Sequence, residues 1–429
     1  MIKRIIAILS LLAIMLSMST LGTLSASAAE ADWLDKEPAQ NVDYSFAVLG
    51  DIQTITYKDA HDGTKYLETM FDWILENRES RKIEYVIGLG DTVETLRCTA
   101  GGNDKNPKEW AKARSQLRKL LEADLPHMVI RGNHDDESGY HKYVCTEEYQ
   151  AQMDEFYYDS AKTATHGNSR SNCYRKLEIG NHKYLMLGLD YSAWDDADVI
   201  AWANNVIEEH SDYKVILNVH AFLSGQGGLY KDNIGSASSN YLTEEKLPFD
   251  AQALYNDLVK KHENMFMVLC GHVAIKNPII KTVPGANGNK VYTILVDPQT
   301  YEETDPSGFV FMVNITDGGT KVEFEYLSTD KEKYFGQNNQ YSRALPEGFL
   351  PAFVPPAVTE ATTAPTTEAT TEAPATTEAP VTTGETTIEA PATTADSGGG
   401  CGGSIASTVA VCCSIGTALA AFAMRRKED

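Results

Sequence analysis

The chain has 429 residues, with 37 Lys and Arg against 60 Asp and Glu, which gives a formal net charge of −23. This length has room for one large catalytic domain with appended segments. The acidic balance argues against a nucleic-acid-binding surface, because phosphate backbones require basic patches. It also disfavours polyanionic substrates in general, but it is compatible with small phosphate esters.

Residues 1–29 are predicted to be an export signal. Lys3 and Arg4 form a basic start, an apolar stretch follows over residues 5–18, and the small residues 26–29 supply a cleavage site. An uncleaved N-terminal anchor is the alternative, but the short apolar stretch favours cleavage. We therefore expect the domain that follows, over residues 30–355, to be exported.

Five short segments in this domain each place a metal-ligating side chain beside glycine or at a strand end, and a β-rich run precedes each one. They are residues 50–53, 90–94, 132–135, 219–220 and 271–274. Buried alternating strands would deliver all five to one edge of a sheet. Asp and Asn oxygens mixed with His nitrogens suit borderline divalent metals such as Zn, Mn or Fe.

The remaining patterns of the domain predict an α/β fold centred on sheets. Apolar residues at helical spacing predict helices over residues 64–78, 107–123, 196–210 and 249–262. Further β-rich runs, which we expect to form a second sheet, cover residues 183–189, 290–296, 308–315 and 321–327.

Four cysteines lie in the domain, and export permits disulfides between them. They are Cys98, Cys145, Cys173 and Cys270. Four cysteines allow three pairings, among which the sequence does not choose. A Cys98–Cys145 bridge would stiffen loops near the metal edge, whereas Cys270 lies inside a strand and is expected to be a buried apolar residue.

The C-terminal part is predicted to tether the domain to a membrane. Residues 356–403 are rich in Thr, Pro, Glu and Ala, which predicts a disordered stalk whose threonines could carry sugars. Residues 404–424 contain no charge and, as a helix, would span about 31 Å, enough to cross a bilayer. The basic start of residues 425–429 predicts a cytoplasmic tail, so the domain should face outward on a Gram-positive-type bacterial surface.

The order of the five motifs, over residues 44–326, resembles that of the calcineurin-like metallophosphoesterase superfamily. The resemblance implies a four-layer α/β/β/α sandwich of two mixed sheets flanked by helices. It also implies a metal-dependent hydrolase of phosphate mono- or diesters, in which a metal-activated water attacks phosphorus. Any single motif could instead be a turn, a helix cap or a buried polar residue, but five together in this order are poorly explained that way.

The same resemblance implies a role for each motif residue. Asp51 would bind a first metal and Asp91 would bridge two metals. The second metal would be completed by Asn133, His220 and His272. His134 would protonate the leaving alcohol or polarise the phosphoryl group, and Asp135 would orient His134 by a hydrogen bond.

Two positions depart from the superfamily pattern, and both affect the first metal. Gln53 and Ala274 stand where histidines are usual, so this metal keeps Asp51 and the bridging carboxylate, to which the Gln53 oxygen could be added. Such a divergent bacterial subfamily could bind Mg, Mn or Ca weakly here, recruit Asp297 or Gln299 as a substitute, or work with one metal. The cofactor is therefore predicted to be one or two divalent ions, Mn, Fe, Zn or Mg.

The substrate is open. The Gly-rich loop over residues 222–240, which contains Tyr230, could close over a substrate or be a solvated connector. Tyr191 and Trp194 could stack on a base or sugar or pack in the core, and Arg131 could contact phosphate or point into solvent.

Three classes of function compete for this chain. The leading one is a surface phosphoesterase acting on a small phosphate ester. The others are a metal-dependent binding module displayed on a stalk, with impaired catalysis, and a surface structural protein. An intact His134 favours catalysis, because a binding module has no need of a proton donor. The oligomeric state is left open.

Overall fold

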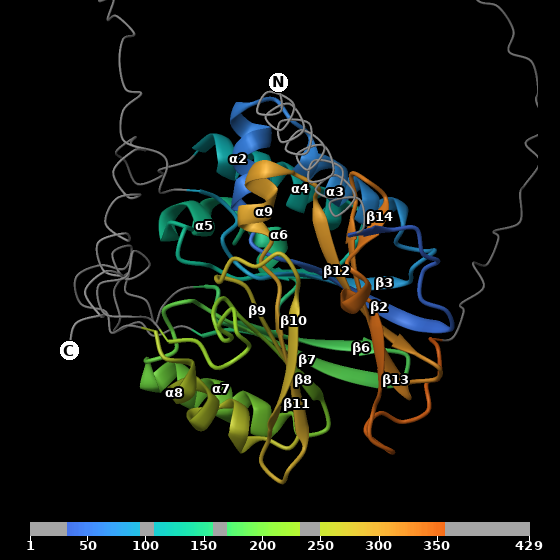
Figure 1. The fold of residues 1–429 in the computed structure, drawn as a ribbon. Helices are drawn as coiled ribbons and strands as arrows, with labels where there is room; N and C mark the ends of the chain where they lie inside the picture. Colours follow the sequence, from blue (N-terminus) through green and yellow to red (C-terminus); the bar gives the residue numbers. More distant parts are fainter. Residues whose placement is uncertain (1–31, 95–106, 158–169, 232–248, 357–429) are drawn as a thin grey trace, which may run out of the picture. The chain divides into compact units, whose positions relative to one another are not determined.

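The computed structural model describes residues 32–94, 107–157, 170–231 and 249–356. These residues form an α/β domain in which two sheets pack face to face (Figure 1). Within this part of the chain, no helix is both long and apolar enough to cross a membrane. The predicted export signal, membrane segment and tail, and the stalk beyond residue 356, lie outside the described residues and remain predictions.

The first sheet combines N-terminal and C-terminal strands. Its order is β1 (Trp33–Leu34), β14 (Lys333–Phe335), β13 (Lys321–Ser328), β12 (Phe309–Thr316), β2 (Val42–Leu49), β3 (Ile83–Gly88) and β4 (His127–Val129), and β15 (Tyr341–Ala344) pairs with β13. Strands β2, β3 and β4 are parallel, whereas β12 is antiparallel to β2 and to β13. The sheet is therefore mixed.

The second sheet comes from the middle of the chain. Its order is β10 (Ile279–Pro284), β11 (Lys290–Leu295), β9 (Met265–Cys270), β8 (Lys214–Val219), β7 (His182–Leu189), β6 (Cys173–Ile179) and β5 (Glu155–Phe156). Strands β7, β8, β9 and β11 run parallel, and the outer strands β10, β6 and β5 pair antiparallel.

The assignment of the predicted strands 308–315 and 321–327 to the second sheet is wrong. They correspond to β12 and β13, and β12 lies inside the first sheet between β2 and β13. All eight residues of β12 are buried. A strand covered on both faces reads as a continuous apolar run whichever sheet it joins, so the sequence pattern could not make this choice.

Helices cover the outer face of each sheet and complete the predicted four layers (Figure 1). Beside the first sheet lie α2 (Gln53–His61), α3 (Tyr66–Glu76) and α4 (Pro107–Glu122), and beside the second lie α7 (Ala197–Glu209) and α8 (Ala251–Asp257). The shorter elements are α5 (Glu137–Tyr143), α6 (Glu147–Gln150), α9 (Gln299–Thr304), η4 (Val259–Lys261) and η5 (Gln337–Asn339). The four predicted helices are confirmed to within a few residues as α3, α4, α7 and α8 with η4.

Side-chain alternation decides how these layers pack. On β7, Tyr184 and Met186 belong to the core between the two sheets, whereas Leu185 and Leu187 belong to the core under α7 and α8. This is the period-2 pattern of a strand buried on both faces. By contrast, α2 has no apolar stripe, because its buried side chains are mostly polar, and periodicity therefore missed it.

Three of the four cysteines of the domain lie among the described residues. Cys145, Cys173 and Cys270 are all buried free thiols, which confirms the expectation for Cys270. The Cys98–Cys145 pairing, one of those that the sequence left open, is not formed, because Cys145 is a free thiol that is 2% exposed and packs in the core. Cys98 itself lies outside the described residues.

Candidate metal centre

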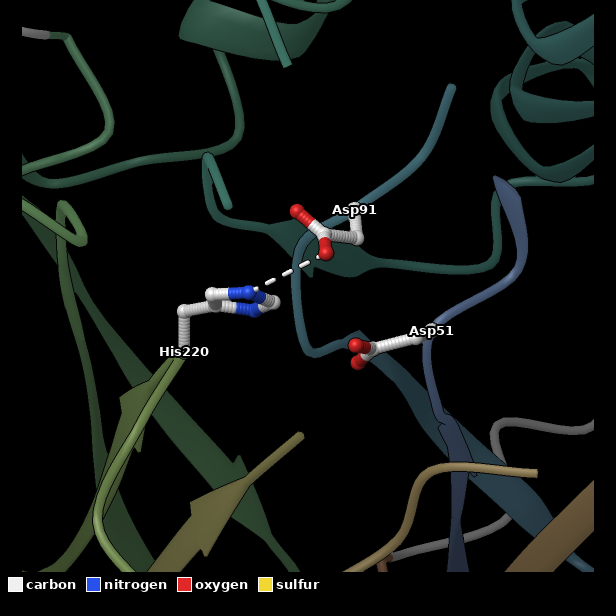
Figure 2. Close-up of side chains that lie close together, drawn as sticks. All are labelled: Asp51, Asp91 and His220. Atoms are coloured by element: carbon white, nitrogen blue, oxygen red, sulfur yellow. Dashed lines mark ion pairs between the residues drawn. The ribbon is translucent and has the colours of Figure 1, made fainter. Parts of the chain in front are cut away.

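The five motif segments gather at one edge of the sandwich. Asp51, Asp91 and Asn133 follow the parallel strands β2, β3 and β4, and His220 and His272 follow β8 and β9. Parallel strands end at the same edge of their sheet. The face-to-face packing of the two sheets then brings the two sets of strand ends together, and Figure 2 shows Asp51, Asp91 and His220 directed toward a common space.

Four of the predicted ligand side chains converge tightly. The Asn133 Oδ1 atom lies 2.9 Å from His220 Nε2 and 2.8 Å from His272 Nδ1. Asp91 Oδ2 lies 3.3 Å from the same His220 nitrogen. Two imidazole nitrogens, an amide oxygen and a carboxylate oxygen form a donor set that borderline divalent metals accept.

Asp51 extends this cluster toward the position predicted for the first metal. Ligand atoms of Asp51, Asp91 and His220 all lie within 4.8 Å of one another. Asp51 Oδ2 accepts a hydrogen bond from the His272 backbone N–H at 2.9 Å, but Asp51 Oδ1 is buried without a hydrogen-bond partner. A buried carboxylate oxygen is costly unless it is compensated. The residues present therefore fit a divalent cation at Asp51.

The backbone around the predicted ligands has an unusual conformation that brings them close together. Asp91 and His272 adopt positive φ angles of 49° and 71°, and Gly90 adopts 95°. Non-glycine residues rarely occupy this region, and such strain gathers at functional sites. A Cβ atom at Gly132 would collide with Asp91, and one at Gly271 would collide with Asp51 Oδ1. The motif glycines thus make room for the carboxylates.

Gln53 and Asp297 lie beside Asp51. Gln53 is fully buried, and its amide contacts the amide of Gln299. When its NH2 group faces the backbone, it donates to the carbonyl oxygens of Asp51 at 3.3 Å and Asp91 at 3.1 Å. Asp297, 1% exposed, accepts a hydrogen bond from Gln299 Nε2 at 3.1 Å, and its charge, after burial, raises the pKa of Asp51. Metal ligation by Gln53 remains a prediction.

His134 stands at the rim of the cluster and has a carboxylate partner that sequence reasoning missed. Its Nδ1 atom lies 2.8 Å from Glu94 Oε1, and its Nε2 atom lies 3.9 Å from Asp91 Oδ2. The sequence did contain a signal for this partner, because Glu94 and Asp91 belong to the same motif segment, residues 90–94. A second carboxylate in that segment could have been considered as a partner of the histidine.

The predicted hydrogen bond from Asp135 to His134 is wrong, because Asp135 turns back toward the backbone. Its Oδ1 atom accepts from the N–H groups of Thr92 at 2.8 Å and Val93 at 3.0 Å, and its Oδ2 atom accepts from Gly132 N–H at 3.0 Å. Three backbone donors compensate a fully buried carboxylate. Asp135 therefore ties the two motif loops together, and Glu94 holds the His134 ring.

The clustered charges shift the protonation of the site. Burial lowers the pKa of His134, but the negative charges of Asp91 and Glu94 outweigh it and raise the pKa to about 9. Burial, together with Asp297 and Asp91, raises the pKa of Asp51 well above its ordinary value. A bound divalent cation would favour the ionised form of Asp51, since opposite charge stabilises a carboxylate.

Arg131 turns into the domain rather than toward a phosphate or solvent, so both expectations for it are wrong. Its guanidinium forms a two-point ion pair with Asp190, with both N–O distances at 2.8 Å, and it donates to the Asp135 carbonyl oxygen at 3.2 Å. The Arg131 and Asp190 side chains are 9% and 0% exposed. Arg131 therefore anchors the loop that carries Asn133 and His134.

The aromatic residues near the centre pack beneath the histidines. Tyr191 is buried, stacks on Phe249 with the ring centres 5.7 Å apart, and lies against the rings of His220 and His272. This confirms core packing as the role of Tyr191. The Tyr230 hydroxyl lies 3.1 Å from His272 Nε2, so the described part of the loop 222–240 contacts the centre.

An open pocket of about 350 Å³ lies over the cluster. It is lined by Asp91, Asn133, His134, Tyr230, His272, Val273 and Ala274. A larger pocket of about 840 Å³ lies elsewhere, beside α4, and its lining includes none of the motif residues. Of these two pockets, only the smaller one is lined by predicted metal ligands whose atoms converge, so we assign the candidate site to it.

Comparison with known proteins gives a family match over much of this domain. The model of the family described as calcineurin-like phosphoesterase matches residues 44–276, more than half of the chain. The uncharacterized protein YvnB of Bacillus subtilis (strain 168) is 26% identical over 242 residues, which cover 55% of this chain and only 16% of that protein.

Solved structures resemble the chain more distantly. TT1561 of Thermus thermophilus is 11% identical with a TM-score of 0.35, and the match covers 67% of this chain and 99% of that one. GAP50 of Plasmodium, the anchor in the inner membrane complex, is 12% identical with a TM-score of 0.37, over 70% of this chain and 88% of that one.

Proposed function

The chain belongs to the calcineurin-like phosphoesterases, and from this premise we propose that it hydrolyses small phosphate mono- or diesters with the help of divalent metal ions. The observation that carries the proposal is the meeting of Asp91, Asn133, His220 and His272 beneath an open pocket that His134 also lines. A donor set for a metal and a proton donor thus share one surface.

Different residues would bind the metal ions and donate the proton during hydrolysis. Asp91, Asn133, His220 and His272 would hold one cation, and Asp51 with Asp91 would hold another. Bound divalent cations supply Lewis acidity and activate a water at neutral pH. His134, whose Nδ1 atom lies 2.8 Å from Glu94 Oε1, would donate a proton to the leaving alcohol when its ring is protonated.

Glu94 supports this role of His134. Its contact with His134 Nδ1 at 2.8 Å fixes the ring and leaves Nε2 on the side of Asp91. A carboxylate on one ring nitrogen also stabilises the charged imidazolium. Glu94 is therefore proposed as a positioning residue, which acts on the substrate only through His134.

We also propose that the enzyme works outside the cell, tethered to the membrane. This rests on the sequence alone: the export signal over residues 1–29 and the uncharged segment over residues 404–424. Protease treatment of intact cells should remove the domain from full-length protein in the membrane fraction. Complete protection in intact cells, together with digestion after lysis, would contradict the surface location.

Hydrolysis is tested with the purified full-length chain. We would measure release of para-nitrophenol from para-nitrophenyl phosphate and its bis ester with Mn, Mg, Zn or Ca. Metal-dependent turnover that is lost in Asp91→Asn and kept in the surface variant Glu122→Gln would support the proposal, and the preferred ester would give the subclass. Tight metal binding without turnover of either ester would favour the binding module displayed on a stalk.

A further inference from the structure

Asp297 lies where the first cation lacks both imidazoles of the family pattern. We propose that Asp297 is a ligand of this cation and that the position is therefore an all-oxygen site, selective for hard ions such as Mn²⁺ or Mg²⁺. The inference rests on the proposed metal centre and gives its two cation positions different chemistry.

The fold fixes Asp297 beside the segment that lacks a histidine. Strand β11, which precedes Asp297, runs parallel to β9, which precedes His272. The Asp297 carbonyl oxygen accepts from the Ile275 N–H at 2.8 Å, and Val296 N–H donates to the Cys270 carbonyl oxygen at 2.9 Å. Ala274, which stands where a histidine is usual, therefore directly precedes Ile275, the residue that is hydrogen-bonded to Asp297.

The carboxyl groups at this position are buried and close together. Asp51 and Asp297 are 2% and 1% exposed, and Gln299 contacts both Asp297 and Gln53, which stands two residues after Asp51. Buried carboxylates need a compensating partner for each oxygen. The independent sign of a ligand is Asp51 Oδ1, which is buried without a hydrogen-bond partner. A cation between these carboxylates would satisfy that oxygen.

Asp297 keeps ligand capacity after its other contacts are counted. Its Oδ1 atom accepts from the Gln299 N–H at 3.0 Å, and its Oδ2 atom accepts from Gln299 Nε2 at 3.1 Å. A carboxylate has about four acceptor sites, so lone pairs remain on both oxygens. Gln299 in turn contacts the Gln53 amide, and this chain of contacts orients the Asp297 carboxylate.

The two positions then differ in the metals they prefer. Asp51, Asp297 and the shared Asp91 supply only carboxylate oxygens to the first cation, and such ligands suit Mg²⁺, Mn²⁺ and Ca²⁺. The second cation receives the imidazoles of His220 and His272, which suit Zn²⁺ and related ions. We therefore expect a centre that holds two different metals when both classes are supplied.

The test is metal binding by the full-length chain after chelator treatment. Elemental analysis and calorimetric titration with Mn²⁺ and Zn²⁺ would be made on wild type, Asp297→Asn and two controls. Glu302→Gln removes a buried carboxylate whose oxygens accept from the Ser307 and Phe309 N–H groups. Gln299→Ala removes only the residue that positions Asp297.

We expect wild type and Glu302→Gln to bind two cations, and Asp297→Asn to lose the Mn²⁺ equivalent while keeping Zn²⁺. The Mn²⁺ affinity should fall in Asp297→Asn by more than the roughly 10–100-fold that follows from losing a residue that only supports a ligand, and Gln299→Ala should stay within that range. Unchanged Mn²⁺ binding in Asp297→Asn, equal losses in Asp297→Asn and Gln299→Ala, or a single cation in wild type would each overturn the inference. If the chain binds two cations in an Asp297-dependent way but hydrolyses neither ester, the proposed hydrolysis would be contradicted and the role of Asp297 as a ligand would be supported.

Discussion

The buried ion pair between Arg131 and Asp190 anchors the loop that carries Asn133 and His134, and the variant Asp190→Asn measures how much stability it contributes. Asp190 accepts two hydrogen bonds from Arg131 at 2.8 Å, and others from Ser171 Oγ at 2.7 Å and Ser192 N–H at 2.9 Å. The substitution keeps the volume but leaves the Arg131 charge buried without its counter-ion. Breaking a buried pair in this way costs about 3–5 kcal/mol.

The assay is urea unfolding of the full-length chain, with the free energy of unfolding taken from the midpoint and the slope. The matched control is Glu122→Gln, which breaks an ion pair with Arg118 whose side chains are 62% and 65% exposed. An exposed pair contributes about 0–1 kcal/mol, so the control should unfold almost as wild type does.

Two results would contradict the role of Asp190 as the counter-ion of a buried Arg131 charge. One is a loss in Asp190→Asn no larger than in Glu122→Gln, at an unchanged slope. The other concerns the double variant Arg131→Met with Asp190→Leu, which removes both charges. It should regain most of the lost stability, because apolar replacement of a buried pair is often neutral. A double variant less stable than Asp190→Asn would contradict the unpaired charge as the cause.

Four further predictions concern catalysis, metal binding, pH and thiols. His134→Ala should lower kcat by about 10²–10⁴ with unchanged metal content by elemental analysis, and an unchanged kcat would exclude His134 as proton donor. Gly271→Ala should lose the cation at Asp51, because its Cβ would collide with Asp51 Oδ1. Gly225→Ala should keep the cation, because among the described residues no atom beyond its chain neighbours lies nearer than 3.5 Å to its Cβ; equal metal-titration curves for the two variants would contradict this. Burial lowers the pKa of His127 to about 4 from 6.5, so the unfolded chain binds more protons between these values and unfolding becomes easier as pH falls through this window. The loss is about 3 kcal/mol at most, and His127→Gln should lack it in denaturant titrations at pH 4.5 and 7; an identical pH response in the two proteins would count against it. Of the seven cysteines, Cys145, Cys173 and Cys270 are buried free thiols. No more than the other four should therefore react with a thiol reagent before unfolding, and a fifth fast-reacting thiol would be inconsistent with the fold.

Several features of the fold could be predicted from short stretches of sequence. Apolar spacing located α3, α4 and α7, because a helix buries one face every 3.6 residues. The motif order also indicated which side chains would meet at the strand ends, and Asn133, His220 and His272 lie together as expected. In both cases the signal is local, since each residue follows from its own strand or helix.

Other features depend on contacts between distant segments, and there the local pattern failed. The motif Gly-Asn-His-Asp suggested that Asp135 would hold its neighbour His134, but the Asp135 side chain reaches the backbone of Thr92 and Val93, and Glu94 reaches His134 instead. Adjacent residues in a loop point in directions set by φ and ψ, which sequence spacing does not give.

Short motifs were enough to indicate the family, the strand ends that carry the predicted ligands and the absence of histidine at Gln53 and Ala274. The place of β12 in the first sheet and of Asp297 near Asp51 became clear from the fold. Strand pairing and sheet packing bring together residues hundreds of positions apart, and their register depends on the whole core rather than on any local run.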